Sequence, residues 1–98
     1  MKRIESIVQE ERECFVCGSV QDLERHHCIG GNPGRKLSEK YGLTVYLCAE
    51  HHRGDGGVHG GDGGELNDRI KRTAQKAFEE VRSREEFMGV FGRNYIDG

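Results

Sequence analysis

Two pairs of metal-ligating side chains with the same internal spacing constrain this chain more than any other feature. The first pair is Cys14-x-x-Cys17 and the second is Cys48-x-x-His51. A spacing of two residues lets both side chains of a pair face one tetrahedral ion, and two such pairs supply the four ligands of a structural zinc site. The pattern therefore predicts a closed site of three cysteines and one histidine. The alternative is that the cysteines are small buried hydrophobic residues or a redox pair.

The small size of the chain makes such a site useful. It has 98 residues, of which 15 are glycine, and it contains four phenylalanines, three tyrosines and no tryptophan. A domain with so few large apolar side chains often needs a metal or a disulfide for stability. We therefore predict one domain, 1–98, in which zinc ties the N-terminal cysteine pair to the rest of the fold.

The sequence also bears on location and charge. No apolar stretch is long enough to span a membrane, and the N-terminal MKRIESIVQEERE lacks a secretory hydrophobic region. We expect a cytoplasmic protein without membrane contact, whose cysteines are reduced and bind metal. The formal charge of −2 does not indicate a nucleic-acid binder for the chain as a whole. Basic residues nevertheless flank the histidines and follow on a later helix: Arg35, Lys36, Lys40, Arg53, Arg69, Lys71, Arg72 and Lys76.

Local patterns predict an α+β fold. One or two helical turns with a weak apolar stripe are expected over residues 3–12, and two short strands are expected at 23–29 and 43–48. The segment between the strands is rich in turn formers, with one helical turn expected at 37–41. A short helix is expected over 49–53, before a glycine-rich tract ends it.

The C-terminal part of the chain predicts helices over 65–92. A serine followed three residues later by a glutamate resembles a capping box that opens a last helix after Ser83. That helix is expected to bury Phe87 and Phe91 and to end at Gly92. The preceding helix has one predicted buried face, formed by Leu66, Ile70, Ala74, Ala77, Phe78 and Val81.

All five histidines lie in two short clusters, which indicates a second metal with a different role. If His51 binds zinc, four histidines remain: His26, His27, His52 and His59. His26 and His27 are neighbours on a predicted strand, so their side chains point to opposite faces. One of them can then bind metal while the other transfers protons. The alternative is that these histidines are ordinary surface or core residues, as we expect Cys28 to be a core residue that points away from His27.

The segment ERHHCIGG…GLTVYLCAEHHRGDGGVHG resembles the HNH endonucleases, the ββα-metal nuclease class, in their zinc-stabilised form. It is especially similar to small HNH proteins of phages and prophages. The match covers 14–60, and the tail AQKAFEEVRSREEFMGVFGRNYIDG is similar to the helical end of such phage proteins. The resemblance implies a small treble-clef-like ββα-metal (HNH) centre over 14–60, followed by the C-terminal helices of 65–92.

The resemblance also implies roles for the second set of histidines. His27 is the implied general base that takes a proton from the attacking water, because a neutral imidazole suits this task near pH 7. His26 and His52 are the implied ligands of a catalytic divalent metal, with His59 as a third. This metal would act as a Lewis acid on the phosphate and the departing oxygen. Positive charge for the phosphate is available from Arg35, Lys36 and Arg53.

Several points stay open within this resemblance. The middle asparagine of the family stands close to the position of Gly42 or Leu43 here. Asn32 is the nearest candidate to orient His27, although a turn former beside Pro33 is an equally good interpretation. The catalytic metal is Mg²⁺, Mn²⁺, Ni²⁺ or Zn²⁺; imidazole ligands favour the last three, and two aspartates offer oxygen ligands. These aspartates are Asp55 and Asp62.

The predicted function is therefore that of a metal-dependent DNA endonuclease that hydrolyses phosphodiester bonds, with a structural zinc ion and a catalytic metal. DNA is the expected partner, together with a phage packaging or recombination protein, and we expect contacts to phosphates and to DNA shape to dominate. The main alternative is a non-catalytic zinc-binding module that docks DNA or a phage packaging partner. A redox-active thiol protein is a third possibility. The second set of histidines distinguishes these hypotheses, because a docking module does not need it.

Overall fold

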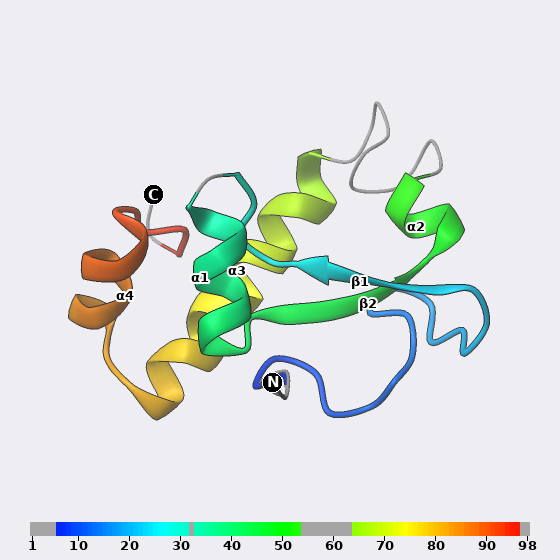
Figure 1. The fold of residues 1–98 in the computed structure, drawn as a ribbon, viewed down its shortest axis with the longest axis horizontal. Helices are drawn as coiled ribbons and strands as arrows, with labels where there is room; N and C mark the ends of the chain where they lie inside the picture. The colour runs from blue at the N-terminus through cyan, green and yellow to red at the C-terminus, as the bar shows by residue number, and fades with distance from the viewer. Residues whose placement is uncertain (1–5, 32, 54–63, 97–98) are drawn as a thin grey trace.

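A computed structural model describes residues 6–31, 33–53 and 64–96, and within these ranges the chain forms a two-stranded sheet and four helices. This confirms the predicted α+β class. The strands are β1 (Leu23–His27) and β2 (Thr44–Cys48), and the helices are α1 (Gly34–Tyr41), α2 (Ala49–Arg53), α3 (Gly64–Val81) and α4 (Arg84–Phe91). The helices α1, α3 and α4 gather at one end of the sheet and α2 lies at the other (Figure 1). Among the described residues, no helix is both long and apolar enough to cross a membrane.

The two strands are antiparallel, and their register decides where the ligands lie. Leu23 is opposite Cys48, and His27 is opposite Thr44. Cys48 therefore lies beside the start of β1, whereas the histidine pair occupies the other end of that strand. Strand β2 packs the sheet against the hydrophobic core, in which its Leu47 side chain is fully buried.

The N-terminal segment runs along the outer edge of β2 (Figure 1). The expected helical turns over 3–12 are wrong for the described residues 6–12, which contain no helix. The backbone N–H of Tyr46 donates to Gln9 Oε1 at 2.8 Å, and the N–H of Phe15 donates to the carbonyl of Tyr46 at 2.8 Å. The edge of a short strand needs hydrogen-bond partners, and this need outweighs a weak helical stripe.

Helix α1 is longer than the single turn expected at 37–41, and it is fixed against the segment that follows β1. The buried hydroxyl of Ser38 donates to the carbonyl of Ile29 at 2.9 Å and accepts from the Ile29 N–H at 3.1 Å. A Cβ added at Gly34 would lie 3.2 Å from the Ile29 carbonyl oxygen, so a larger residue there would have to displace this carbonyl slightly. The helix ends at Gly42 in the left-handed conformation, with φ of 74°.

The predicted buried face of α3 is largely confirmed. Ile70, Ala74 and Phe78 are all fully buried and pack with residues of the sheet in one hydrophobic core. Leu66 and Ala77 are half-buried, and Val81, which ends the helix, is 64% exposed.

The last helix begins and ends as predicted. The Ser83 hydroxyl accepts a hydrogen bond from the Glu86 N–H at 3.1 Å, which caps the N-terminus of α4. Phe87 is fully buried, and Phe91 is partly buried against the core. Gly92, with φ of 72°, terminates the helix in the left-handed conformation that glycine tolerates.

Candidate metal centre and histidine site

The predicted zinc ligands come together. One ligand atom from each of Cys14, Cys17, Cys48 and His51 lies within 4.8 Å of the others. The sulfur atoms of Cys17 and Cys48 are 3.9 Å apart, and Cys14 Sγ is 3.6 Å from His51 Nδ1. Two sulfur ligands of a tetrahedral zinc ion are ~3.8 Å apart, and a sulfur and a nitrogen ~3.5 Å. The group therefore has the spacing needed to hold a metal ion such as zinc.

Local backbone structure builds this group from two distant segments. Cys14 forms a parallel bridge with Tyr46 of β2, which places the N-terminal cysteine pair beside the strand that ends at Cys48. The N–H of Gly18 donates to the Cys14 carbonyl at 2.9 Å, and its φ of 76° closes the tight turn. Helix α2 begins directly after Cys48, so its first turn returns His51 to the cysteines, with Cys48 Sγ 3.2 Å from His51 Nδ1.

Cys14 and Cys28 differ in the environment of their thiols. Burial opposes ionisation of Cys14, but hydrogen bonds from the backbone of Cys48, Cys17 and Val16 outweigh it and lower the pKa of Cys14 to about 6. The resulting thiolate is the form that binds zinc. Burial alone raises the pKa of Cys28 to about 12, and this side chain is 1% exposed within the core. Cys28 is therefore a core residue, as the sequence predicted.

One face of β1 brings a carboxylate and a histidine toward α2. Glu24 and His26 are two residues apart on the strand and share this face. The rings of His26 and His52 are 5.4 Å apart between centroids, and Nδ1 of His52 donates to Glu24 Oε1 at 2.5 Å. The His52 interaction, followed by the charge of Arg53, lowers the pKa of Glu24 against the effect of desolvation. Two of the predicted ligands of a catalytic metal therefore lie side by side, one of them held by a carboxylate.

The opposite face of β1 brings His27 toward α1. Nε2 of His27 donates to Glu39 Oε2 at 2.9 Å, and Arg25 forms an ion pair with the same carboxylate oxygen. The Arg25 hydrogen bond, together with the smaller effect of His27, holds the pKa of Glu39 below its ordinary value despite some desolvation. The alternation predicted for the histidine pair is thus present: His26 lies beside His52 of α2, and His27 contacts Glu39 of α1.

Two hollows meet at His27. One, of about 490 Å³, is lined by both members of the histidine pair and by residues of α3 and the C-terminal segment. The other, of about 540 Å³, is lined by His27 and Glu39 together with Arg25, Arg35 and Lys36. His26 and His27 therefore border a common space although their rings have different partners.

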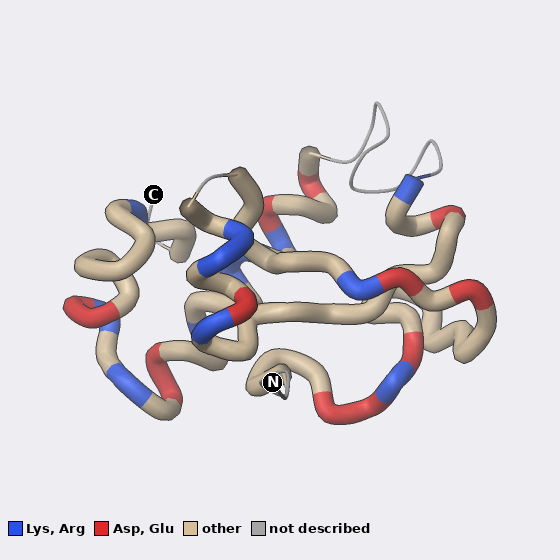
Figure 2. Tube along the Cα trace, viewed as in Figure 1, with Lys and Arg blue, Asp and Glu red and all other residues tan. Residues whose placement is uncertain are grey.

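The predicted phosphate-binding cations do not all lie together. Acidic and basic positions alternate over much of the chain (Figure 2), so local groupings matter more than the total charge. Arg35 and Lys36 line the hollow beside His27. Arg53 instead pairs with Glu24 at 2.6 Å, at the end of α2.

Some predicted site residues lie outside the described part of the chain. These are Asn32, His59, Asp55 and Asp62. Among residues 6–31, 33–53 and 64–96, Cys14, Cys17, Cys48 and His51 form the one cluster of three or more side chains that could hold a metal ion. The described residues thus supply two imidazoles of the predicted second site, and its third ligand stays a prediction.

Three residues beside the histidines were missed in the sequence. Glu24 and Arg25 carry a signal, because each precedes a histidine by two positions on a strand and must share its face. Glu39 carries none, since its approach to His27 depends on the length and placement of α1. Comparison of the chain with protein-family models, curated proteins and solved structures finds no match.

Proposed function

We propose that this protein is a metal-dependent DNA endonuclease of the HNH type, with a treble-clef-like ββα-metal centre. The observation that supports this best is the hollow lined by both His26 and His27. On one side of it His26 lies next to His52, and on the other His27 is held by Glu39. Phosphodiester hydrolysis needs both a proton acceptor and a stabiliser of the departing oxygen near one phosphate.

The four-ligand group has a structural role in this proposal. Three cysteines and one histidine leave no open position on a tetrahedral zinc ion, so this ion would not take part in the reaction. It would join the N-terminal segment to the end of β2 and the start of α2. This fixes the direction of α2 and therefore of His52, which directly follows a zinc ligand.

A second divalent metal would be held by His26 and His52, with His59 as the predicted third ligand. A metal-binding histidine commonly donates its other ring N–H to a carboxylate, which fixes its tautomer and orientation. Glu24 accepts this bond from Nδ1 of His52, so Nε2 is the atom proposed to face the metal. When bound, Mg²⁺, Mn²⁺, Ni²⁺ or Zn²⁺ would supply Lewis-acid stabilisation of the phosphate.

His27 is the proposed general base. With Nε2–H donated to Glu39, Nδ1 is the nitrogen that accepts the proton of the attacking water. Glu39 orients this ring, a task for which the sequence offered only Asn32. Arg35 and Lys36 line the hollow on the other side of His27 and are the proposed contacts for phosphate there.

Metal analysis combined with a plasmid-nicking assay tests this function. The zinc-loaded protein is assayed with added Mg²⁺, Mn²⁺, Ni²⁺ or Zn²⁺, beside the His27→Ala variant. We expect two metal equivalents and nicking by the wild type, and a loss of ~10²–10⁴-fold in rate for the variant. Circular dichroism and zinc content show that the variant keeps its fold. One tightly bound zinc ion without any cleavage would instead favour the docking module.

A further inference from the structure

A second group of basic side chains lies away from Arg35, Lys36 and Arg53. Asp68, Lys71 and Arg72 of α3, with Arg93 and Tyr95 of the C-terminal segment, line a hollow of about 370 Å³. The lining thus includes three cationic side chains and one carboxylate. The proposed chemistry at the histidines makes no use of these residues.

The C-terminal segment is fastened to α3 by a buried amide. Gln75 is fully buried, although a buried amide is unfavourable unless it forms hydrogen bonds. Its Oε1 accepts from the Tyr95 N–H at 2.6 Å, and its Nε2 donates to Asn94 Oδ1 at 3.1 Å. These bonds fix the two residues that follow Arg93, so the position of this hollow is determined by the core.

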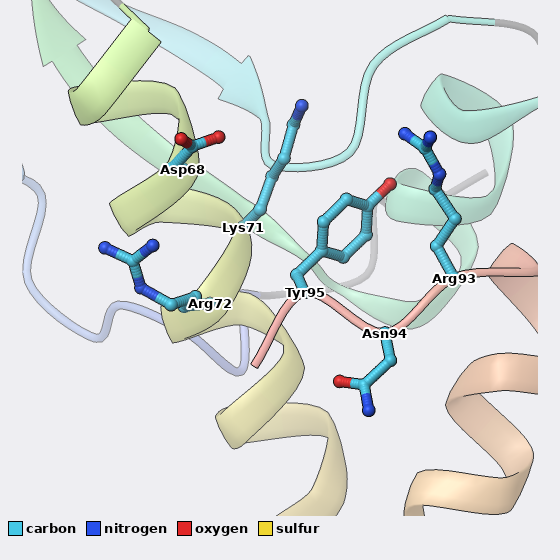
Figure 3. A pocket seen from close by; sticks show the side chains of 6 residues that line it. All are labelled: Asp68, Lys71, Arg72, Arg93, Asn94 and Tyr95. Carbon is cyan, nitrogen blue, oxygen red and sulfur yellow. The ribbon is translucent and has the colours of Figure 1, made fainter. Parts of the chain in front are cut away.

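Three hydrogen-bond donors that line this hollow point in the same direction. Figure 3 shows the side chains of Lys71, Tyr95 and Arg93 side by side, with the amino, hydroxyl and guanidinium groups pointing in a common direction. Arg72 and Asn94 point elsewhere. The Lys71 amino group lies 5.5 Å from the centre of the Tyr95 ring, which helps to hold both side chains in place.

This donor group adjoins the histidine pair. Lys71, Arg93 and Tyr95 also line the larger hollow that His26 and His27 border. The cations Arg25, Arg35 and Lys36 line the other hollow, which His27 also borders. Basic side chains therefore line both hollows that meet at His27.

We propose that Lys71, Tyr95 and Arg93 bind a backbone phosphate of duplex DNA next to the one placed at His27. This assignment rests on the proposed function for its choice of ligand. Two cations and a hydroxyl group match the charge and the acceptor oxygens of a phosphodiester. The nearby Asp68 carboxylate is outnumbered by these donors and does not cancel the local positive charge.

Binding without cleavage tests the assignment. Fluorescence anisotropy measures the affinity of the zinc-loaded His27→Ala protein for a labelled DNA duplex over a range of salt concentrations. Lys71→Gln/Arg93→Gln is compared with Lys40→Gln/Lys76→Gln, which removes the same charge from exposed positions on α1 and α3. We expect the first pair to weaken binding roughly tenfold and to reduce the salt slope by about one to two.

A further variant separates a specific contact from total charge. Tyr95→Phe keeps the ring and the charge but removes the hydroxyl, and it should also weaken binding at constant salt slope. Equal affinities for the Lys71→Gln/Arg93→Gln and Lys40→Gln/Lys76→Gln proteins overturn the assignment, even if the wild type nicks plasmids. Absence of nicking by the wild type, with the expected affinity difference present, overturns the proposed nuclease and leaves the phosphate site intact.

Discussion

The carboxylate of Glu39 on α1 accepts a hydrogen bond of 2.9 Å from Nε2 of His27 on β1. Arg25, two residues before His27 on the same strand, contacts the same carboxylate oxygen and lowers the pKa of Glu39. The acceptor therefore stays ionised at neutral pH and selects the tautomer with the proton on Nε2. A nucleophile-activating base oriented by a third group is a common arrangement in hydrolases.

This relationship predicts the effect of Glu39→Gln. The change keeps the size of the side chain but removes the charge that orients His27, so nicking should lose part of the ~10²–10⁴-fold contribution of a positioned base. The loss should be smaller than that of His27→Ala. Initial nicking rates at saturating metal measure it, with Glu80→Gln on the exposed side of α3 as the matched control. Equal rates for the two glutamine variants would contradict the orienting role.

The Glu24–His52 pair predicts that loss of the Glu24 carboxylate weakens binding of the second metal. Glu24→Gln removes the carboxylate behind a proposed metal ligand and should weaken the second metal ~10–100-fold, because such partners fix the ring and raise its basicity. Titration with Mn²⁺ of the zinc-loaded protein measures this affinity. Arg53→Gln is the control, since it breaks the ion pair of Arg53 with Glu24 but keeps the His52 bond. A Mn²⁺ affinity unchanged in Glu24→Gln, or equally lowered in Arg53→Gln, would count against the assignment.

Features that depend on neighbouring residues were predictable from the sequence, and features that depend on packing were not. The spacing of Cys14, Cys17, Cys48 and His51 is local within each pair, so it predicted a group that the structure brings together. Capping by Ser83 is likewise local, and it is confirmed.

The contacts that complete the histidine site have a different origin. Glu39 lies within the turn expected at 37–41, but it reaches His27 because α1 packs beside β1, and no local pattern predicts that packing. Gln75 has the pattern of an ordinary polar helix residue, yet the core closes over it and it binds the C-terminal segment. A buried polar side chain must form hydrogen bonds, but its burial can be recognised only after the helices and strands are packed.

The four-ligand group predicts that zinc content and thermal stability fall together. Cys17→Ala removes one ligand and should release the zinc ion and lower the midpoint of the thermal transition, because binding energy at a structural zinc site contributes directly to folding. Cys28→Ala is the control, since Cys28 is buried in the core and does not belong to the group. Elemental analysis and a thermal melt measure both effects. A Cys17→Ala protein that melts like the wild type without bound zinc would rule out the structural role.

Acidification should destabilise the metal-free fold through Cys14. Burial opposes ionisation, but hydrogen bonds from the backbone of Cys48, Cys17 and Val16 lower the pKa of Cys14 from 9.0 to about 6. Between about pH 6 and about pH 9 the unfolded chain therefore binds more protons at this thiol than the folded protein does, so the free energy of unfolding rises with pH across this window. The stabilisation by the Cys14 thiolate is fully present above about pH 9 and is lost as the pH falls through about 6. Urea unfolding of the metal-free protein, compared with Cys14→Ser across the same window, measures it, and parallel pH dependences for the two proteins would show that Cys14 is not the group responsible.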